Sequence, residues 1–433
     1  MELRELTKKE FDGYALNHPL GSFQQTSSWG RFMEGDKFHA YYVGGVVKEK
    51  IVGASLLLSY ERKKGERIFY APRGFLIDYK NEELLKEFTE EVKKFIVEKH
   101  GVFLKIDPYI LVRDRDSDGN IIDGGVNNDF VEVNLCHANF IRVNDRIQPK
   151  WLSRINLKDK TIDNVFKNFS PKARQTVRRN ERLGFKVRDF DFKDIDKFMD
   201  IINEESKKYN TVVPTRTFYE DLKRTFDGNI QFKEVYFKKD EVISNIDKMI
   251  LDVNKEKEVR INNYHNSKMT EEYFIDKELE DEEEIKRLES LKEYFSKCSD
   301  DVSMGIYMFM TIGNEVVALN GGIVDEYNKL DASYTLHYEM IKYAIDNGYK
   351  YYNLYEIGDI TDSNNKLKNS YNYKKNFGGE VVELVGEYDL VINPKYTDIA
   401  RKYFPEYLGV KTIFKWFSYL ILWHQYKNMI LCI

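Results

Sequence analysis

The sequence predicts an α/β protein of two domains, with a helical segment inserted into the second domain. A chain of 433 residues is too long for one ordinary hydrophobic core. Residues 39–61 and 305–324 each have the pattern of a strand, a polar turn and a second strand. Each is followed by a helical run, a glycine and another strand. Residues 239–297, between these two copies, instead have helical spacing.

The repeated order indicates two copies of one α/β fold, although unrelated α/β domains can share the same pattern. Helices are expected over 81–99 and 331–347. Gly101 and Gly348 follow these runs, where a helix C-cap belongs. The strands after them, VFLKIDPY and YKYYNLYEIG, are rich in aromatic and aliphatic residues.

The inserted segment is predicted to form a helical hairpin. Apolar residues recur at helical spacing in both of its halves, namely Ile246, Met249, Ile250 and Val253, then Ile285, Leu288, Leu291 and Phe295. Each apolar stripe is narrow, as in a two-stranded antiparallel coiled coil. We therefore expect an arm that projects from the second domain and completes neither hydrophobic core.

Composition favours a folded cytoplasmic protein and excludes several classes. The 14% aromatic content argues against intrinsic disorder. Cys136, Cys298 and Cys432 have neither disulfide nor zinc-site spacing. The charged N-terminus argues against a signal peptide, and no stretch of about 20 apolar residues could span a membrane. The sequence has no motif of a phosphate loop, a zinc protease or a serine hydrolase, so neither metal nor cofactor is expected.

The segment 167–188 carries a dense positive charge, with eight basic residues and one acidic residue. Ser170 and Pro171 predict the start of a helix here, and Gly184 predicts its end. Three of the basic residues lie four positions apart and share one helix face: Arg174, Arg178 and Arg182. Charge of a single sign on one face favours a polyanionic partner, and the alternative is a solvated surface.

Two carboxylates stand where the active sites of α/β proteins often lie. Asp107 and Glu356 each end a predicted strand. A carboxylate in this position could bind or deprotonate an amine, and the alternative is a carboxylate that caps a turn. His39 and His337 lack the spacing of metal ligands and are expected to be structural or surface residues.

The string YNYKKNFGG is a further candidate site. It places Lys374 and Lys375 between Tyr373 and Phe377. Aromatic neighbours can aim an ammonium into a cleft, where it could stabilise an oxyanion or bind phosphate. The same kind of string also marks the edges of strands. In a strand, Lys374 and Lys375 would point to opposite faces of the sheet.

Taken together, five stretches of the chain resemble the FemA/FemB family, which builds interpeptide bridges in Gram-positive cell walls. They are YAPRGFLIDYKNEELL, KIDPY, the basic helix, the helical arm and YKKNFGGEVVELVGEYDLVIN. The resemblance implies two tandem GNAT-like acyltransferase domains, the second of which carries a coiled-coil arm. The implied boundaries are 1–145 plus about 385–433 for the first domain, 146–384 for the second and 239–297 for the arm.

The resemblance also implies an activity and no cofactor. Glycine, alanine or serine would pass from aminoacyl-tRNA, the co-substrate, to the lysine-type side-chain amine of a peptidoglycan precursor. That precursor would be a lipid-linked or UDP-linked muramyl-pentapeptide. The family's F-K-K-G-[FY] motif falls on Tyr373–Phe377, so Lys374 would hold the aminoacyl end of the tRNA and assist transfer, with Tyr373, Lys375 and Phe377 beside it.

Other positions follow the family less closely. Arg216 and Tyr219 are the candidates for binding the phosphate of the precursor, although their spacing is irregular. Ala318 and Leu319 stand where family members often have two tyrosines, one of which contacts phosphate. The fold is therefore expected to transfer to this chain more fully than the contacts to the precursor.

The C-terminal segment 403–433 contains the run WFSYLILW with lysines nearby. It is either a helix packed on the first domain or an interfacial segment at the inner face of the plasma membrane. Two other functions remain open. An acetyl-CoA-dependent N-acyltransferase would usually show an [RQ]-x-x-G-x-[GA] loop, of which no clear copy exists. An RNA-binding or coiled-coil scaffold would leave the two α/β domains unexplained.

Overall fold

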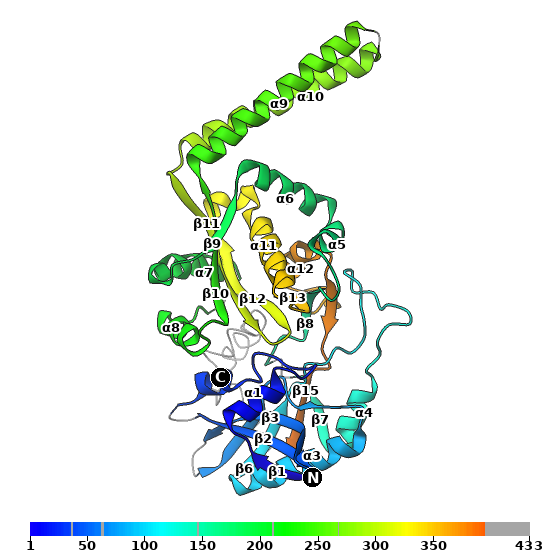
Figure 1. Cartoon of the computed structure of the whole chain (residues 1–433). Coiled ribbons are helices and arrows are strands. Elements are labelled where there is room, and N and C mark those ends of the chain that lie inside the picture. The colour runs from blue at the N-terminus through cyan, green and yellow to red at the C-terminus, as the bar shows by residue number, and fades with distance from the viewer. Residues whose placement is uncertain (36–37, 62–64, 145–146, 210–211, 267, 395–433) are drawn as a thin grey trace, which may run out of the picture.

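The computed structural model describes residues 1–394 except 36–37, 62–64, 145–146, 210–211 and 267 (Figure 1). It contains two mixed β-sheets that lie one above the other, and a helical arm rises from the upper sheet (Figure 1). The segment 403–433 lies outside the described residues, so its place stays a prediction. In the described part, no helix is both long and apolar enough to cross a membrane.

The first sheet is built mainly from the N-terminal third of the chain, and its strand order is β1-β2-β3-β4-β6-β15-β7, with β5 beside β3. Strand β15 arrives from the far end of the sequence and pairs antiparallel with both β6 and β7. The strands are β1 Glu2–Glu5, β2 Phe38–Val47, β3 Lys50–Glu61, β4 Arg67–Ala71, β5 Leu76–Ile77, β6 Gly101–Ile106, β7 Phe140–Val143 and β15 Glu387–Val391.

In the part of the chain that the structure describes, four helices flank this sheet: α1 Lys8–Ala15, α2 Ser27–Met33, α3 Glu82–Glu98 and α4 Phe130–His137. The side chain of Asn81 caps α3, whose buried face carries residues spaced three or four apart, as expected of an amphipathic helix. The prediction that Gly101 ends this helix is wrong. His100 takes the left-handed conformation, with φ 61°, and Gly101 already belongs to β6. A side chain on Gly101 would collide with Ile96 and Phe69, so close packing requires the glycine.

The second sheet has the order β14-β8-β13-β12-β11-β10-β9. Its strands are β8 Trp151–Asn156, β9 Lys186–Asp189, β10 Ile230–Lys238, β11 Asp301–Ile312, β12 Glu315–Ile323, β13 Tyr351–Glu356 and β14 Glu380–Glu383. Its helices are α5 Ile162–Lys167, α6 Pro171–Leu183, η2 Phe192–Asp194, α7 Ile195–Tyr209, α8 Arg216–Thr225, η3 Asp325–Leu330, α11 Ala332–Asp346 and α12 Lys368–Lys375. Gly348 follows α11 with φ 76°, the left-handed conformation that its predicted position at the helix C-cap requires.

The two sheets repeat one plan, but not in the register that the sequence suggests. Each sheet has one parallel pair among its described strands, β4 with β6 and β12 with β13. The hairpin β11–β12 therefore corresponds to β3–β4, whereas the pattern in 39–61 forms β2–β3. Where β2 and β3 are joined by the two residues Lys48 and Glu49, the second sheet has the arm between β10 and β11.

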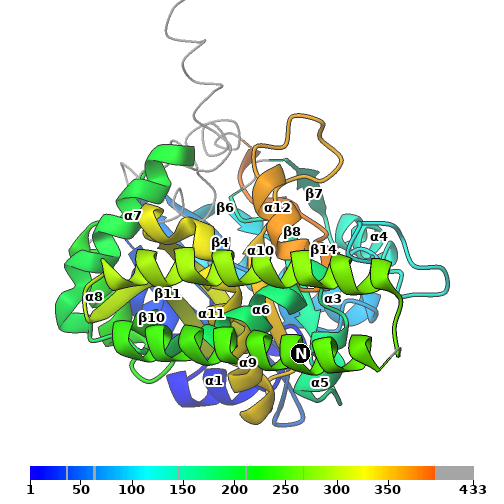
Figure 2. The ribbon, with the colours of Figure 1, turned by 90° about the horizontal axis from the view of Figure 1, so that it is seen from above.

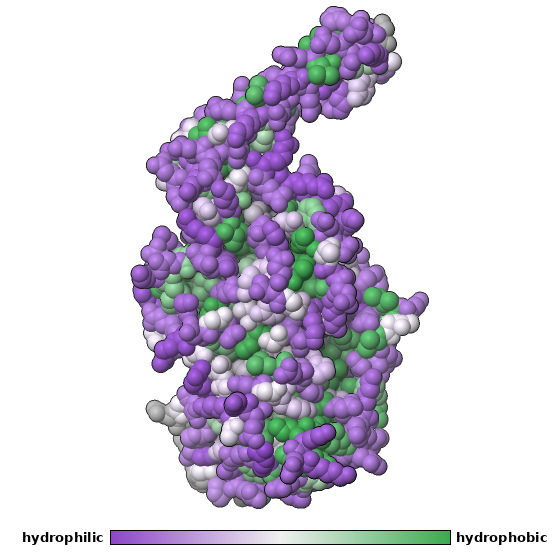
Figure 3. All heavy atoms as spheres, in the orientation of Figure 1, coloured by the Kyte–Doolittle hydropathy of each residue, from purple (hydrophilic) through white to green (hydrophobic). Residues whose placement is uncertain are grey.

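The arm consists of α9 Lys239–His265 and α10 Glu271–Ser296, two antiparallel helices that lie side by side (Figure 2). Most of its surface is hydrophilic (Figure 3). Its base differs from the prediction, because buried residues there belong to the core of the second sheet: Val242, Ile246, Met249, Leu288 and Phe295. The rings of Phe185 and Phe237 pack against Phe295 at 6.2 and 5.0 Å. The base is thus core structure, and only the distal part projects freely.

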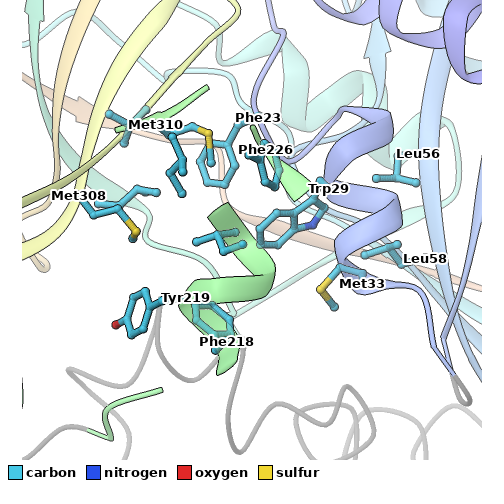
Figure 4. Packing of buried hydrophobic residues seen from close by; sticks show 14 of the residues in the cluster. Phe23, Trp29, Met33, Leu56, Leu58, Phe218, Tyr219, Phe226, Met308 and Met310 are labelled. Atoms are coloured by element: carbon cyan, nitrogen blue, oxygen red, sulfur yellow. The ribbon is translucent and has the colours of Figure 1, made fainter. Parts of the chain in front are cut away.

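One hydrophobic cluster joins the two sheets (Figure 4). Trp29 of α2 is fully buried and stands 6.3 Å from the ring of Phe226, which follows α8. Met308 and Met310 of β11 close the cluster from the second sheet. Because burial of such side chains is strongly stabilising, this shared core fixes the second sheet relative to the first.

Candidate active site

The main pocket of the second sheet opens where two neighbouring strands separate. β12 and β13 pair in parallel only over a short stretch, in which Glu315–Val317 lie opposite Tyr351–Asn353. Both strands continue beyond this stretch. Beyond that point lies a pocket of about 350 Å³. Its lining includes Glu205, Tyr307, Leu319, Asn320, His337, Tyr355, Glu356, Asn369, Ser370, Tyr373 and Lys374. The equivalent pair in the first sheet, β4 with β6, stays paired to the end of both strands.

Irregular backbone on both strands accounts for the separation. Met308 pairs with Asn320 and Phe309 with Ala318, which leaves Leu319 as an extra, bulged residue of β12. On β13, Tyr355 has φ 67°, a conformation uncommon for a tyrosine. Backbone irregularities of this kind gather at functional sites. Ala318 and Leu319 line the pocket, so no phenol stands where the family often has two tyrosines.

Lys374 lies in the last turn of α12, so the alternative that its motif marks a strand edge is wrong. Its Nζ donates a hydrogen bond to the main-chain oxygen of Glu356 at 2.6 Å. Burial lowers the pKa of Lys374 to about 8, against the opposing effect of the Glu356 carboxylate. The side chain is half-buried and lines the pocket, where it holds most of its charge at neutral pH.

Beside this lysine, the rings of His337, Tyr373 and Phe377 pack against one another. His337 bonds through Nδ1 to the hydroxyl of Tyr352 at 2.7 Å. Burial, followed by the charge of Lys374, lowers the pKa of His337 to about 3, so the imidazole is neutral. Tyr373 lines the pocket and packs edge-on against Phe377 at 5.4 Å. Phe377 itself is fully buried and does not line the pocket. The structure therefore does not place it where it was predicted to touch substrate.

Lys375 points away from the pocket, toward a long loop of the first domain. Its Nζ forms an ion pair with Asp118. In the same helix, Tyr371 donates a hydrogen bond to the main-chain oxygen of Ser117 at 2.8 Å. These contacts clamp α12 against the loop between β6 and α4. They give Lys375 a structural partner and leave Lys374 as the lysine of the motif that lines the pocket.

The two candidate carboxylates have different surroundings. Glu356 ends β13, lines the pocket and influences Lys374 directly. Asp107 is buried outside the pocket lining, where it accepts hydrogen bonds from the Arg73 backbone at 2.6 Å and from the Tyr70 hydroxyl at 3.0 Å. Burial raises the pKa of Asp107 to about 6, although Arg73 opposes the shift. These contacts favour the structural alternative for Asp107.

The two predicted phosphate ligands are not brought together in the pocket. Arg216 is exposed at the start of α8 and pairs with Asp196 and Glu220. Tyr219 is fully buried, and its hydroxyl accepts a hydrogen bond from Asn320 at 3.3 Å. Tyr219 therefore contacts a pocket residue, Asn320, without lining the pocket itself.

The basic helix α6 begins and ends as predicted. The Ser170 hydroxyl caps it, Pro171 opens it, and Gly184 closes it with φ 92°. Ser170 also joins Asn376, the C-cap of α12: its N–H donates to the Asn376 main-chain oxygen at 2.8 Å, and its hydroxyl donates to Oδ1 at 2.7 Å. The start of the basic helix is thus tied to the end of the helix that carries Lys374.

The three arginines of the predicted face differ in how accessible their guanidinium groups are to a ligand. Arg174 donates to the main-chain oxygens of Lys167 and Phe169, at the end of α5 and just beyond it. Arg178 and Arg182 are exposed, and the guanidinium of Arg178 lies 5.6 Å from the ring centre of Phe166. Arg178 and Arg182 are therefore the members of the face most available to a phosphate.

A sequence model of the FemAB family matches residues 6–402 of this chain. The chain belongs to the FemAB family. It is 26% identical over 410 residues to aminoacyltransferase FemA of Staphylococcus aureus strain MW2, covering 91% of this chain and 96% of that protein. This membership shows that the FemAB protein described here is an aminoacyltransferase enzyme.

Solved structures are similar to this FemAB protein over most of its length. The crystal structure of FemX matches this chain with a TM-score of 0.74 and 20% sequence identity. The match covers 92% of this chain and 100% of the FemX chain. A tandem GNAT protein from the clavulanic acid biosynthesis pathway has a TM-score of 0.44 and 8% identity, covering 91% and 99% of the two chains. The likeness to FemX, together with the two sheets, confirms the predicted fold class of two α/β units in tandem.

Several pocket residues escaped the sequence analysis. Glu205 lies on α7, whose only local signal is an ordinary amphipathic pattern. Asn320 and Tyr355 line the pocket because the backbone bends at their strands, which depends on long-range pairing. Asn369 and Ser370 lie in the same helix as Lys374, so a helical interpretation of YNYKKNF would have pointed to them.

Proposed function

We propose that this FemAB protein transfers an amino acid (glycine, alanine or serine) from aminoacyl-tRNA to the lysine-type side-chain amine of a peptidoglycan precursor. The acceptor would be a lipid-linked or UDP-linked muramyl-pentapeptide. The observation that carries the proposal is the position of Lys374, which lines the pocket between β12 and β13 on a helix tied to the basic helix α6. The basic helix at one end of this arrangement suits a polyanion, and Lys374 at the other end suits a reactive ester.

The reaction is the aminolysis of an ester. The nitrogen of the acceptor amine attacks the carbonyl carbon, the bond from that carbon to the ribose oxygen breaks, and the amine's proton passes to the ribose oxygen. The ammonium of Lys374 stabilises the negative charge that develops on the carbonyl oxygen. Holding both substrates in the pocket supplies much of the remaining rate, because an aminoacyl ester is already activated.

The polyanion is expected to follow α6. Arg178 and Arg182 are exposed there, and phosphate binding by such residues releases counterions. The bonds between Ser170 and Asn376 place the start of this helix beside the end of α12. Along the arm, by contrast, acidic residues outnumber basic ones, most clearly in DKELEDEEE of α10. The arm is therefore a poor surface for RNA, and the basic helix is the better one.

A direct test combines the purified protein with tRNA charged with glycine, alanine or serine and with a lysine-containing precursor. Mass spectrometry of the precursor should show the mass of one added aminoacyl residue, and ribonuclease treatment of the charged tRNA beforehand should abolish it. Modification of the precursor by acetyl-CoA in the absence of tRNA would contradict the proposal and favour an N-acyltransferase.

A further inference from the structure

One ring nitrogen of His337 is bound to the fold, whereas the other is open to the pocket. His337 lies on α11, is 3% exposed and lines the same pocket as Lys374. Its Nδ1 lies 2.7 Å from the hydroxyl of Tyr352 on β13. Among the described residues, Nε2 has no hydrogen-bond partner, and it is not enclosed by protein atoms. The open nitrogen therefore faces the pocket that His337 lines.

The contact with Tyr352 determines which nitrogen of the ring carries the proton. Tyr352 is fully buried, and within the described part of the chain Nδ1 of His337 is the one hydrogen-bond partner of its hydroxyl. A buried hydroxyl donates its proton where an acceptor is within reach, so the Tyr352 hydroxyl donates to Nδ1. The proton of the neutral imidazole then lies on Nε2. His337 thus presents an N–H donor to the pocket.

Ring packing fixes the direction of this donor. The ring of His337 stands edge-on to the rings of Tyr307 and Phe377, each with 5.3 Å between centroids. The ring of Tyr373, the neighbour of Lys374 in α12, lies 6.1 Å away. A donor that is held in place before the substrate arrives stabilises a developing charge without reorganisation. The pocket therefore contains a fixed, uncharged donor in addition to the ammonium of Lys374.

We propose that the Nε2–H of His337 is a second donor to the carbonyl oxygen of the donor ester, beside the ammonium of Lys374. The inference rests on the proposed function and adds a catalytic residue to it. The proton stays on Nε2 throughout, and the hydrogen bond strengthens as attack by the amine places negative charge on the oxygen. The carbonyl oxygen is uncharged on arrival, which suits a nearly buried, uncharged donor better than a phosphate of the precursor does.

Two substitutions at this position separate the roles of the two nitrogens. The side-chain amide of asparagine reaches the place of Nδ1, whereas that of glutamine reaches the place of Nε2. At saturating precursor, His337→Asn should keep the contact with Tyr352 and slow single-turnover transfer about 10²–10³-fold, the scale of losing one oxyanion donor. His337→Gln should restore the donor and transfer within about tenfold of the wild-type rate, the scale of losing one uncharged hydrogen bond. His39→Gln, in β2 of the first sheet, is the matched control and should transfer at the wild-type rate.

A second measurement reads the position of the proton directly. Long-range proton–nitrogen correlation spectra of histidine-labelled protein should show His337 protonated on Nε2 at neutral pH. The signal that is missing in His337→Gln assigns the resonance. Protonation on Nδ1 overturns the inference whatever the rates of transfer are.

The rates give three further outcomes, and thermal unfolding verifies that the variants are folded. Transfer by His337→Asn that equals or exceeds transfer by His337→Gln overturns the inference and leaves His337 a structural role through Tyr352. A loss in His337→Asn that rising precursor concentration restores assigns the N–H to the precursor and also overturns the inference. Both results leave the proposed function standing. If the wild type transfers no amino acid from charged tRNA, the proposed function fails and the inference falls with it.

Discussion

Lys374 and Asp107 are both charged groups shielded from solvent, but their partners differ. Asp107 is surrounded by fixed donors, the backbone and guanidinium of Arg73 and the hydroxyl of Tyr70. Lys374 has a main-chain oxygen on one side and the pocket on the other. A charge whose hydrogen-bond partners all belong to the fold stabilises the fold, whereas a charge that faces a cavity is available to a ligand.

Asp107→Ala is expected to lower the free energy of unfolding by about 3–5 kcal/mol, because it leaves the guanidinium of Arg73 buried without its carboxylate. Urea denaturation compared with the wild type measures this loss, and Glu220→Gln, which removes an exposed ion pair with Arg216, serves as the control with a much smaller change. The protein that remains folded should still transfer. Full stability combined with lost transfer would return Asp107 to the list of catalytic candidates.

At the scale of elements, α12 is the part on which the site depends. The first-domain loop holds its Tyr371 and Lys375, the start of α6 holds its C-cap Asn376, and β13 accepts the hydrogen bond from its Lys374. A helix of only eight residues has little stability of its own. Contacts from three directions therefore fix the position of Lys374.

The arm divides into a structural base and a free distal part, and this division can be tested by deletion. Replacing residues 254–285 with a short Gly/Ser link should leave cooperative unfolding unchanged, because the buried residues of the arm all lie outside that range. Removing residues 240–297 should destabilise the second domain, since it deletes Ile246 and Phe295 from its core. Thermal unfolding followed by circular dichroism measures both. An early transition in the shorter deletion would show that the distal arm supports a core.

Across the whole molecule, local signals in the sequence were the reliable ones. The caps of α6 at Ser170 and Gly184 follow from residue chemistry within a few positions, and the structure confirms them. The prediction at Gly101 is wrong because it uses the local pattern alone. Close packing against Ile96 and Phe69 requires the glycine, and the local pattern does not contain these contacts. The two α/β units are predictable from the sequence, whereas their register is not, because β4 lies outside the repeated pattern.

The candidate site was predictable only in part. Lys374 and Glu356 stood out from their local context, and the structure brings both into one pocket. The pocket itself depends on the separation of β12 from β13, the bulge at Leu319 and the backbone of Tyr355, none of which has a local signature. Arg216 was misplaced because nearby carboxylates on α7 and α8 bind it at the surface. The roles assigned to these residues in catalysis stay predictions.

The central claim is that the ammonium of Lys374 serves transfer and not folding, and single-turnover transfer by Lys374→Met tests it most directly. Loss of the ammonium should reduce the rate about 10²–10³-fold, the scale of losing one oxyanion donor. Because burial lowers the pKa of Lys374 to about 8, wild-type transfer should decline as the pH rises through that value. The same burial disfavours the charged form, so Lys374→Met should keep or raise the melting temperature at neutral pH.

Lys375→Met is the matched control. It removes an exposed ion pair with Asp118 and should transfer at close to the wild-type rate. The account predicts slow transfer by Lys374→Met with an intact fold, beside normal transfer by Lys375→Met. Normal transfer by Lys374→Met, or a loss confined to Lys375→Met, would contradict it.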